Sequence, residues 1–227
     1  MPLARWKDLC LDSSDMSVTA EFWAAALDLR FEPRSEAVTL LRGDRPEQST
    51  WVNLVPEPKT VKNRVHPDLR HDLERLLAIG ATVLRAPDDD ISWHVLADPE
   101  GNEFCCFARR PDQPDADVVY ELVVDSADPT AQAGWWTDVL GGTVGAGGDV
   151  PWRWVEGADG VPFLYLVFTP VPEPKSVKNR WHWDLVCDDV DALVAKGATV
   201  LRRPDDDIDW HVLADPEGNE FCAFPSD

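Results

Sequence analysis

The sequence lacks most features of a secreted, membrane-bound or nucleic-acid-binding protein. Its five cysteines form no CxxC pair, so it predicts no disulfide framework or structural zinc cluster, and a reducing, cytoplasmic location is expected. Neither the N-terminal stretch MPLARWKDLCLD nor any later segment has the apolar run of a signal peptide or a membrane span. Basic residues number 21 against 42 acidic ones, and the net charge of −21 argues against nucleic acid and anionic membranes as partners.

What the chain does contain indicates a folded protein. Its 227 residues are 44% hydrophobic, enough for one large domain or two of about 110 residues. Tryptophan occurs eleven times, and its large ring serves both in cores and as a wall for flat ligands. The composition is therefore consistent with an apolar pocket.

Long stretches of the sequence occur twice. Residues 80–107 return at 197–224 with 25 of 28 positions identical. Residues 55–64, VPEPKTVKNR, return at 171–180 with nine of ten identical. Such self-similarity indicates a tandem duplication.

The N-terminal parts of the two copies match more loosely, as DLCLDSSD from Asp8 and ELVVDSAD from Glu121. The copies span residues 1–109 and 118–227. The polar, proline-bearing segment 110–117 is the predicted linker between two domains.

Each copy is predicted to fold as two βαβββ units. A short strand (residues 7–12 or 119–124) leads to a helix capped by an aspartate, and in copy two Asp128 is followed by Pro129 at the first helical position. The two prolines of VPEPK predict a crossover between units, and DPEG predicts a turn between the last two strands. Helices alternating with groups of antiparallel strands favour an α+β fold over a Rossmann-type sheet.

The paired βαβββ units, the helix sequence FWAAAL, the segment VPEPKxVKNRxHxDL and DPEGNEF together resemble the vicinal oxygen chelate (glyoxalase/bleomycin-resistance) superfamily, in its glyoxalase-like branch. The resemblance covers nearly the whole chain, once per copy. It implies that two βαβββ units form a curved cup of mixed sheet with helices outside. It implies no single activity, because the superfamily includes glyoxalases, extradiol dioxygenases, epimerases, fosfomycin thiol transferases and metal-free antibiotic-sequestering proteins.

Strand alternation predicts which side chains of the second unit face the cup. In copy two, Trp183 and Leu185 would pack on the helix, whereas His182 and Asp184 would face the cup. The same pattern places five more residues on the cup face: Arg64, His66, Asp68, Arg70 and Arg180. An Arg–His–Asp row can move protons or orient an anion, since a carboxylate fixes the imidazole tautomer. The alternative is an ion pair with a purely structural role.

The resemblance also implies where a metal would bind. Relatives take ligands from the first strand of each unit and from the last strand of the second, positions that hold Asp8, Glu121, His66, His182, Cys105 and Cys222 here. Relatives have a glutamate at the last-strand position, which here is a cysteine. Glu103 and Glu220 lie two residues earlier and are the remaining carboxylate candidates. A cup without a cofactor is therefore favoured, and a divalent Zn, Fe, Mn or Mg ion held by Asp8, His66, Glu103, Glu121, His182 or Glu220 is the alternative.

Three functions stay open at this point. The favoured one is a cup for a small apolar or aromatic metabolite, which the protein would sequester or transform by acid–base chemistry. Its catalytic candidates are His66, Asp68, Glu103, His182, Asp184 and Glu220, and its ligand-binding candidates are Arg64, Trp93, Cys105, Arg180, Trp210 and Cys222. The others are a metal-dependent lyase, isomerase or dioxygenase, and a non-catalytic dimerisation surface.

Copy two is expected to hold the better-formed site. His182 keeps a seven-residue spacing to Asp189 before its helix, which copy one has lost by one residue. The sequence does not decide between a monomer with internal pseudo-symmetry and a homodimer.

Overall fold

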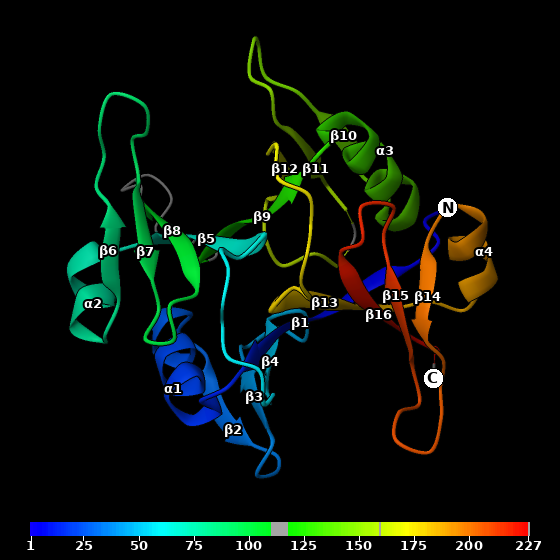
Figure 1. Cartoon of the computed structure of the whole chain (residues 1–227), viewed down its shortest axis with the longest axis horizontal. Coiled ribbons are helices and arrows are strands. Elements are labelled where there is room, and N and C mark those ends of the chain that lie inside the picture. Colours follow the sequence, from blue (N-terminus) through cyan, green and yellow to red (C-terminus); the bar gives the residue numbers. More distant parts are fainter. Residues whose placement is uncertain (110–117, 159, 227) are drawn as a thin grey trace.

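The computed structural model describes residues 1–109, 118–158 and 160–226 (Figure 1). The predicted linker, residues 110–117, lies outside the described residues. Among the helices of the described ranges, none has the length and apolar character needed to cross a membrane.

The four predicted βαβββ units are confirmed. The two units of copy one are β1 (Arg5–Ser13), α1 (Met16–Ala26), β2 (Arg30–Pro33), β3 (Val38–Arg42) and β4 (Ser49–Leu54), then β5 (Val65–His71), α2 (Leu73–Ala78), β6 (Thr82–Arg85), β7 (His94–Ala97) and β8 (Glu103–Ala108). The two units of copy two are β9 (Val119–Ser126), α3 (Pro129–Leu140), β10 (Thr143–Gly145), β11 (Arg153–Glu156) and β12 (Tyr165–Pro170), then β13 (Trp181–Val186), α4 (Val190–Ala195), β14 (Thr199–Arg202), β15 (His211–Ala214) and β16 (Glu220–Phe224).

The expected α+β class is confirmed, with two eight-stranded mixed sheets. Sheet A has the order β14-β15-β16-β13-β1-β4-β3-β2, and sheet B has the order β10-β11-β12-β9-β5-β8-β7-β6 (Figure 1). Each sheet therefore joins the first unit of one copy to the second unit of the other. The sequence did not reveal this exchange, which relates the two sheets by an internal pseudo-two-fold symmetry.

The predicted caps and turns are confirmed. The Asp128 carboxylate accepts hydrogen bonds from the backbone N–H groups of Thr130 (3.1 Å) and Ala131 (3.0 Å), and Pro129 begins α3. In the DPEG turn of copy one, Gly101 has a φ of 86°, a left-handed conformation that side chains other than glycine's rarely adopt. These local signals fix where the elements begin and end.

The helices α1 and α3 each pack against both sheets. Trp23 of α1 lies 4.8 Å (ring centroids) from Trp181 in sheet A and 5.2 Å from Phe104 in sheet B. In the same way, Trp136 of α3 packs 5.0 Å from Trp183. Trp183 is fully buried, which confirms its predicted place on the helix side of β13. The aromatic core therefore joins the two sheets into one body.

Two extended segments connect the sheets near the middle of the molecule. Residues 55–64 lead from β4 in sheet A to β5 in sheet B, and residues 171–180 lead back, as the crossover prediction requires (Figure 1). The Arg64 guanidinium donates a hydrogen bond to the Glu173 carbonyl (2.7 Å). Arg180 donates one to the Glu57 carbonyl (2.9 Å), so the two crossover segments brace each other reciprocally.

Candidate functional site

Each sheet has a polar face opposite the helices, called cup A on sheet A and cup B on sheet B. At the centre of cup A, β1 runs antiparallel to β13, so that Asp8 lies opposite Asp184 and Cys10 lies opposite His182. All four side chains belong to buried residues. Period-two alternation puts them on one face, since the intervening Leu9 and Trp183 belong to the core.

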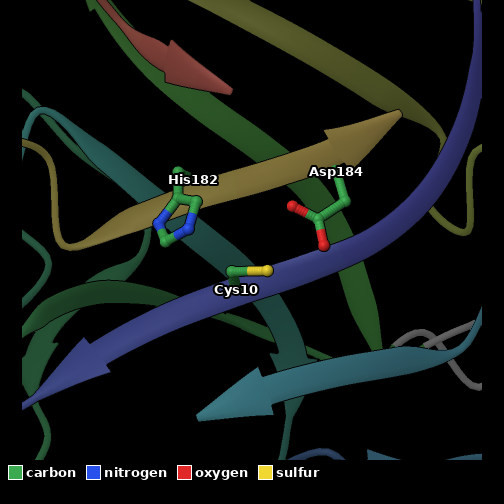
Figure 2. Close-up of side chains that lie close together, drawn as sticks. All are labelled: Cys10, His182 and Asp184. Atoms are coloured by element: carbon green, nitrogen blue, oxygen red, sulfur yellow. The ribbon is translucent and has the colours of Figure 1, made fainter. Parts of the chain in front are cut away.

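Cys10, His182 and Asp184 form a compact group in cup A. Figure 2 shows the Cys10 thiol of β1 between the imidazole and the carboxylate carried by β13. One ligand atom of each residue lies within 4.8 Å of the other two. Sulfur, nitrogen and oxygen donors therefore converge at the centre of the cup.

Asp8 connects this group to open space. Its carboxylate accepts hydrogen bonds from the Lys7 ammonium and from the Ser49 hydroxyl. It also lines a cavity of about 420 Å³ over β1, β3 and β4, whose wall includes the Trp51 ring and Arg42. A small molecule in this cavity would meet two tryptophans, two cationic side chains and two carboxylates, because Trp6 and Glu47 line it as well.

Burial controls protonation in cup A. Removal from water raises the pKa of Asp184 to about 7, with Lys7 opposing the shift and the charge of Asp8 adding to it. Burial lowers the pKa of His182 and raises that of the Cys10 thiol well above its usual range. The imidazole and the thiol are therefore neutral at pH 7.

Cup B repeats this arrangement with one change. Asp68 lies opposite Glu121, and burial together with the Asp68 charge raises the pKa of Glu121 to about 8. The His66 Nε2 atom lies 3.3 Å from the Asp68 carboxylate and 3.8 Å from the Cys105 thiol. The residue opposite His66 is Val123, where cup A has Cys10.

Aromatic rings line cup B. Tyr120 lies 5.6 Å from Phe107 and 5.9 Å from Tyr165, measured between ring centroids. Tyr165 in turn lies 6.0 Å from Trp154. The Arg70 guanidinium stacks 3.7 Å above the Tyr120 ring, a cation–π contact. Cup B thus joins flat apolar surface to a cation.

The structure changes how the predicted acids and histidines are grouped. The sequence hypothesis grouped Asp8 with His66 and Glu121 with His182, which is wrong. Asp8 shares a cup with His182, and Glu121 shares one with His66, because each sheet takes its units from different copies.

Glu103 and Glu220 lie on the last strands, as expected, but they bind the crossover segments. Glu220 accepts hydrogen bonds from Lys175 (2.6 Å) and from the Asn179 backbone N–H (3.1 Å). Glu103 repeats this with Lys59 (2.9 Å) and the Asn63 N–H (3.0 Å). The contacts of these glutamates indicate that they hold the segments in place.

Arg64 and Arg180 also lie away from the cup centres, because they precede β5 and β13 and point at the facing crossover segment. Trp93 and Trp210 stack on Phe107 (5.2 Å) and Phe224 (4.9 Å). The indoles therefore lie at the last strands of the cups, as the predicted pairing of these strands required.

Sequence reasoning missed several residues of the cups: Lys7, Cys10, Ser49, Trp51 and Tyr120. Cys10 could have been found, since it lies two residues after Asp8 on the same strand face. Ser49 and Trp51 come from β4, whose pairing with β1 sequence patterns do not reveal.

The donors can be compared with those that the resemblance implied for a metal. Asp8, the expected first-strand ligand, is engaged by Lys7 and Ser49 and is not among the grouped donors. The donors that converge are Cys10, His182 and Asp184 in cup A, and His66, Asp68 and Cys105 in cup B. His182 Nδ1 is buried and has no hydrogen-bond partner within residues 1–109, 118–158 and 160–226. Three mixed N, O and S donors suit an open zinc site better than an all-oxygen ion.

Comparison with known proteins agrees with this architecture. The sequence profile described as "Glyoxalase-like domain" matches residues 8–107 and 121–224, once in each copy. No curated protein sequence matches the chain significantly.

Solved structures match over nearly the full length. Glyoxalase I from Zea mays aligns with a TM-score of 0.70 at 14% identity, covering 97% of this chain and 92% of that one. A putative dioxygenase from Bacillus subtilis aligns with a TM-score of 0.66 at 12% identity, covering 99% and 86%. At such identities the likeness establishes the fold.

Proposed function

The chain belongs to the family of glyoxalase-like domains, with one domain in each copy. From this premise we propose that it binds a small metabolite in its cups. It would then move a proton on the bound metabolite without the help of a metal. The observation that carries the proposal is a pair of carboxyl groups facing each other in each cup, Asp8 with Asp184 and Glu121 with Asp68. Facing carboxyl groups share a proton, because two like charges at close range in a buried site oppose each other.

Within cup A, Asp8 is the group that reaches the ligand, since it lines the cavity. Asp184 lies behind it, and the raised pKa of about 7 lets this carboxyl group gain or lose a proton near neutral pH. The Lys7 ammonium pairs with Asp8 at the cavity wall. General acid–base groups work best when they titrate near the working pH. His182, neutral and buried, positions this pair and is not itself required to change charge.

The ligand is a small molecule with an apolar or aromatic part and an anionic or carbonyl group. The Trp51 ring and Leu40 offer the apolar wall of cup A, while Lys7 and Arg42 offer positive charge. The volume of about 420 Å³ falls in the range of small-ligand pockets. The reaction class that suits such a site is an isomerase or lyase step that starts with proton abstraction next to a carbonyl.

A cytoplasmic location stays a prediction.

Solvent-deuterium exchange tests the proposal even while the substrate is unidentified. A panel of small carbonyl acids is incubated with EDTA-treated protein in D₂O, and deuterium incorporation is followed by NMR, with tryptophan fluorescence quenching as the binding readout. We expect exchange in at least one compound, and a loss of about a hundredfold or more in Asp8→Asn. The matched control is Asp44→Asn, an exposed carboxylate paired only with Arg30 among the described residues.

Two results would contradict this function. One is exchange that persists at the wild-type rate in both Asp8→Asn and Asp184→Asn. The other is a wild-type protein that neither binds nor exchanges any compound of the panel.

A metal-dependent activity is the second candidate, favoured by the convergence of Cys10, His182 and Asp184 within 4.8 Å. These three residues would hold a zinc ion, which as a Lewis acid would polarise a carbonyl oxygen. The test is zinc content per chain by mass spectrometry of purified protein, with His182→Ala and Cys10→Val compared. Cys10→Val copies the Val123 of cup B, so loss of about half of the bound zinc in that variant would support this candidate and weaken the first.

A further inference from the structure

A large cavity lies outside both cups, between the crossover segments. It has a volume of about 860 Å³ and is lined by residues of 55–64 and of 171–180. Asp12, at the end of β1, and Asp125, at the end of β9, complete the wall. The cavity has two equivalent halves because the two segments are nearly identical in sequence.

The cavity collects positive charge in an acidic protein. Five of its nineteen lining residues are basic, against 21 of 227 in the whole chain, namely Lys59, Lys62, Arg64, Lys178 and Arg180. Acidic residues number four of nineteen, close to their share of 42 in 227. The wall carries a net charge of +1, whereas the chain carries −21.

Lys62 and Lys178 keep much of their surface open although each is ion-paired. Lys62 binds the Asp125 carboxylate at 2.6 Å, and Lys178 binds that of Asp12. The aspartate side chains are 7% and 8% exposed, whereas the lysine side chains are 59% and 56% exposed. An ammonium group has three donors, so both lysines can donate further hydrogen bonds to a molecule in the cavity.

The two arginines add a second observation. One terminal nitrogen of each arginine donates to a backbone carbonyl of the facing segment. The other binds the Asp125 carbonyl (3.0 Å) in Arg64 and the Glu100 carboxylate (2.7 Å) in Arg180. The Nε of each is buried without an acceptor among the described residues. The Arg180 side chain is only 10% exposed. A buried charged donor without an acceptor is costly, and a nearby anion offsets that cost.

We propose that this central cavity is an anion site that takes one small organic dianion per chain, with an acidic group held by each half. The paired halves present a lysine and an arginine each, which suits a ligand with two acidic ends such as a dicarboxylate or a diphosphate. Val55, Val61, Val171 and Val177 line the same space and would contact the middle of such a ligand. This site lies beyond the proposed function of the cups and does not depend on it.

Isothermal titration of the full chain tests the site with two probes, glutarate for the carboxylates and pyrophosphate for the phosphates. Because there is one central cavity and two cups, we expect a stoichiometry of one. The double variant Lys62→Gln/Lys178→Gln should bind about tenfold more weakly or worse, since each lost charge-assisted hydrogen bond contributes to affinity. The matched control is Lys196→Gln, a surface lysine 47% exposed and paired with Asp138 at 2.7 Å, which should bind like the wild type.

A second variant keeps the test decisive if the first one unfolds. Lys62→Gln with Asp125→Asn removes the cation and its buried carboxylate together, so no lone charge is left in the wall. Unchanged binding in either folded variant would overturn the proposal, and so would failure of both probes to bind the wild type. A stoichiometry of two that the folded lysine variants leave unchanged would place the anion in the two cups and would also overturn it.

Discussion

At the scale of single residues, the cups place acids where water cannot solvate them. The Asp184 side chain lies between the thiols of neighbouring strands, and Asp8 faces it across the strand pair. Such a carboxyl group is costly to ionise, and the folded chain therefore retains a proton that the unfolded chain releases. The same residues that would move a proton on a ligand also make the stability of the fold depend on pH.

We predict that stability falls as pH rises from about 4 to 8. The pKa of Asp184 is raised from 3.8 to about 7, and that of Glu121 from 4.5 to about 8. Between these limits the folded state binds more protons than the unfolded state, so the free energy of unfolding decreases with pH by at most about 5 kcal/mol per group. Melting temperatures measured at pH 5.5 and 8.5 should show the lower value at pH 8.5.

Asp184→Asn should reduce this pH dependence, since an amide does not titrate, and the part that remains comes from Glu121. Asp44→Asn is the control, because Asp44 is exposed and should leave the curve unchanged. A melting temperature that is equal at the two pH values, or higher at pH 8.5, would show that the carboxyl pairs ionise without cost.

At the scale of elements, side-chain alternation correctly predicted which residues of β5 and β13 face the cups. It failed for the residue just before each strand. Trp183 and Leu185 are fully buried, because a strand between helix and cup must present every second residue to the core. Arg64 and Arg180 do not continue this pattern. They precede the first strand residue, where the backbone still follows the crossover and carries the side chain to the opposite segment.

The helices α1 and α3 are tied to the turns after β7 and β15 by buried hydrogen bonds. The Trp23 indole N–H donates to the Asp98 carboxylate at 2.8 Å, and the Trp136 N–H donates to Asp215 at 3.2 Å. Asp215 also accepts a bond from the Gln132 amide at 2.9 Å on the same oxygen. The two copies therefore differ in how strongly the buried carboxylate depends on the hydrogen bond from a single indole.

We predict that Trp23→Phe destabilises the fold more than Trp136→Phe. Removing the Trp23 N–H takes a donor from a buried carboxylate, which costs about 1 to 3 kcal/mol, whereas Gln132 still serves Asp215 in the second variant. Urea unfolding followed by circular dichroism measures both. Trp152→Phe, at an indole 39% exposed, is the control for loss of ring size. An equal or larger cost for Trp136→Phe would contradict this account.

At the scale of the whole molecule, the sequence predicted the number and order of units but not which units share a sheet. The pattern of β5 is nearly that of β13, so a strand pattern cannot tell whether β1 or β9 is the partner of each. The choice depends on tertiary packing, in which α1 contacts Phe104 of one sheet and Trp181 of the other. This is why Asp8, Glu121 and the two histidines His66 and His182 lie in the cups but were grouped wrongly.

The exchange of units between copies leads to a prediction about cutting the chain. The central strand pairs β1–β13 and β5–β9 each join copy one to copy two, so neither copy holds a complete sheet. A protease site introduced within residues 110–117 should therefore yield two fragments that elute together from gel filtration at the volume of the intact 25.4 kDa chain. They should separate only in denaturant, since separation exposes the backbone edges and buried faces of four central strands. The uncleaved variant is the control, and fragments that separate in buffer while each keeps its native circular dichroism would show that each copy completes its own sheet.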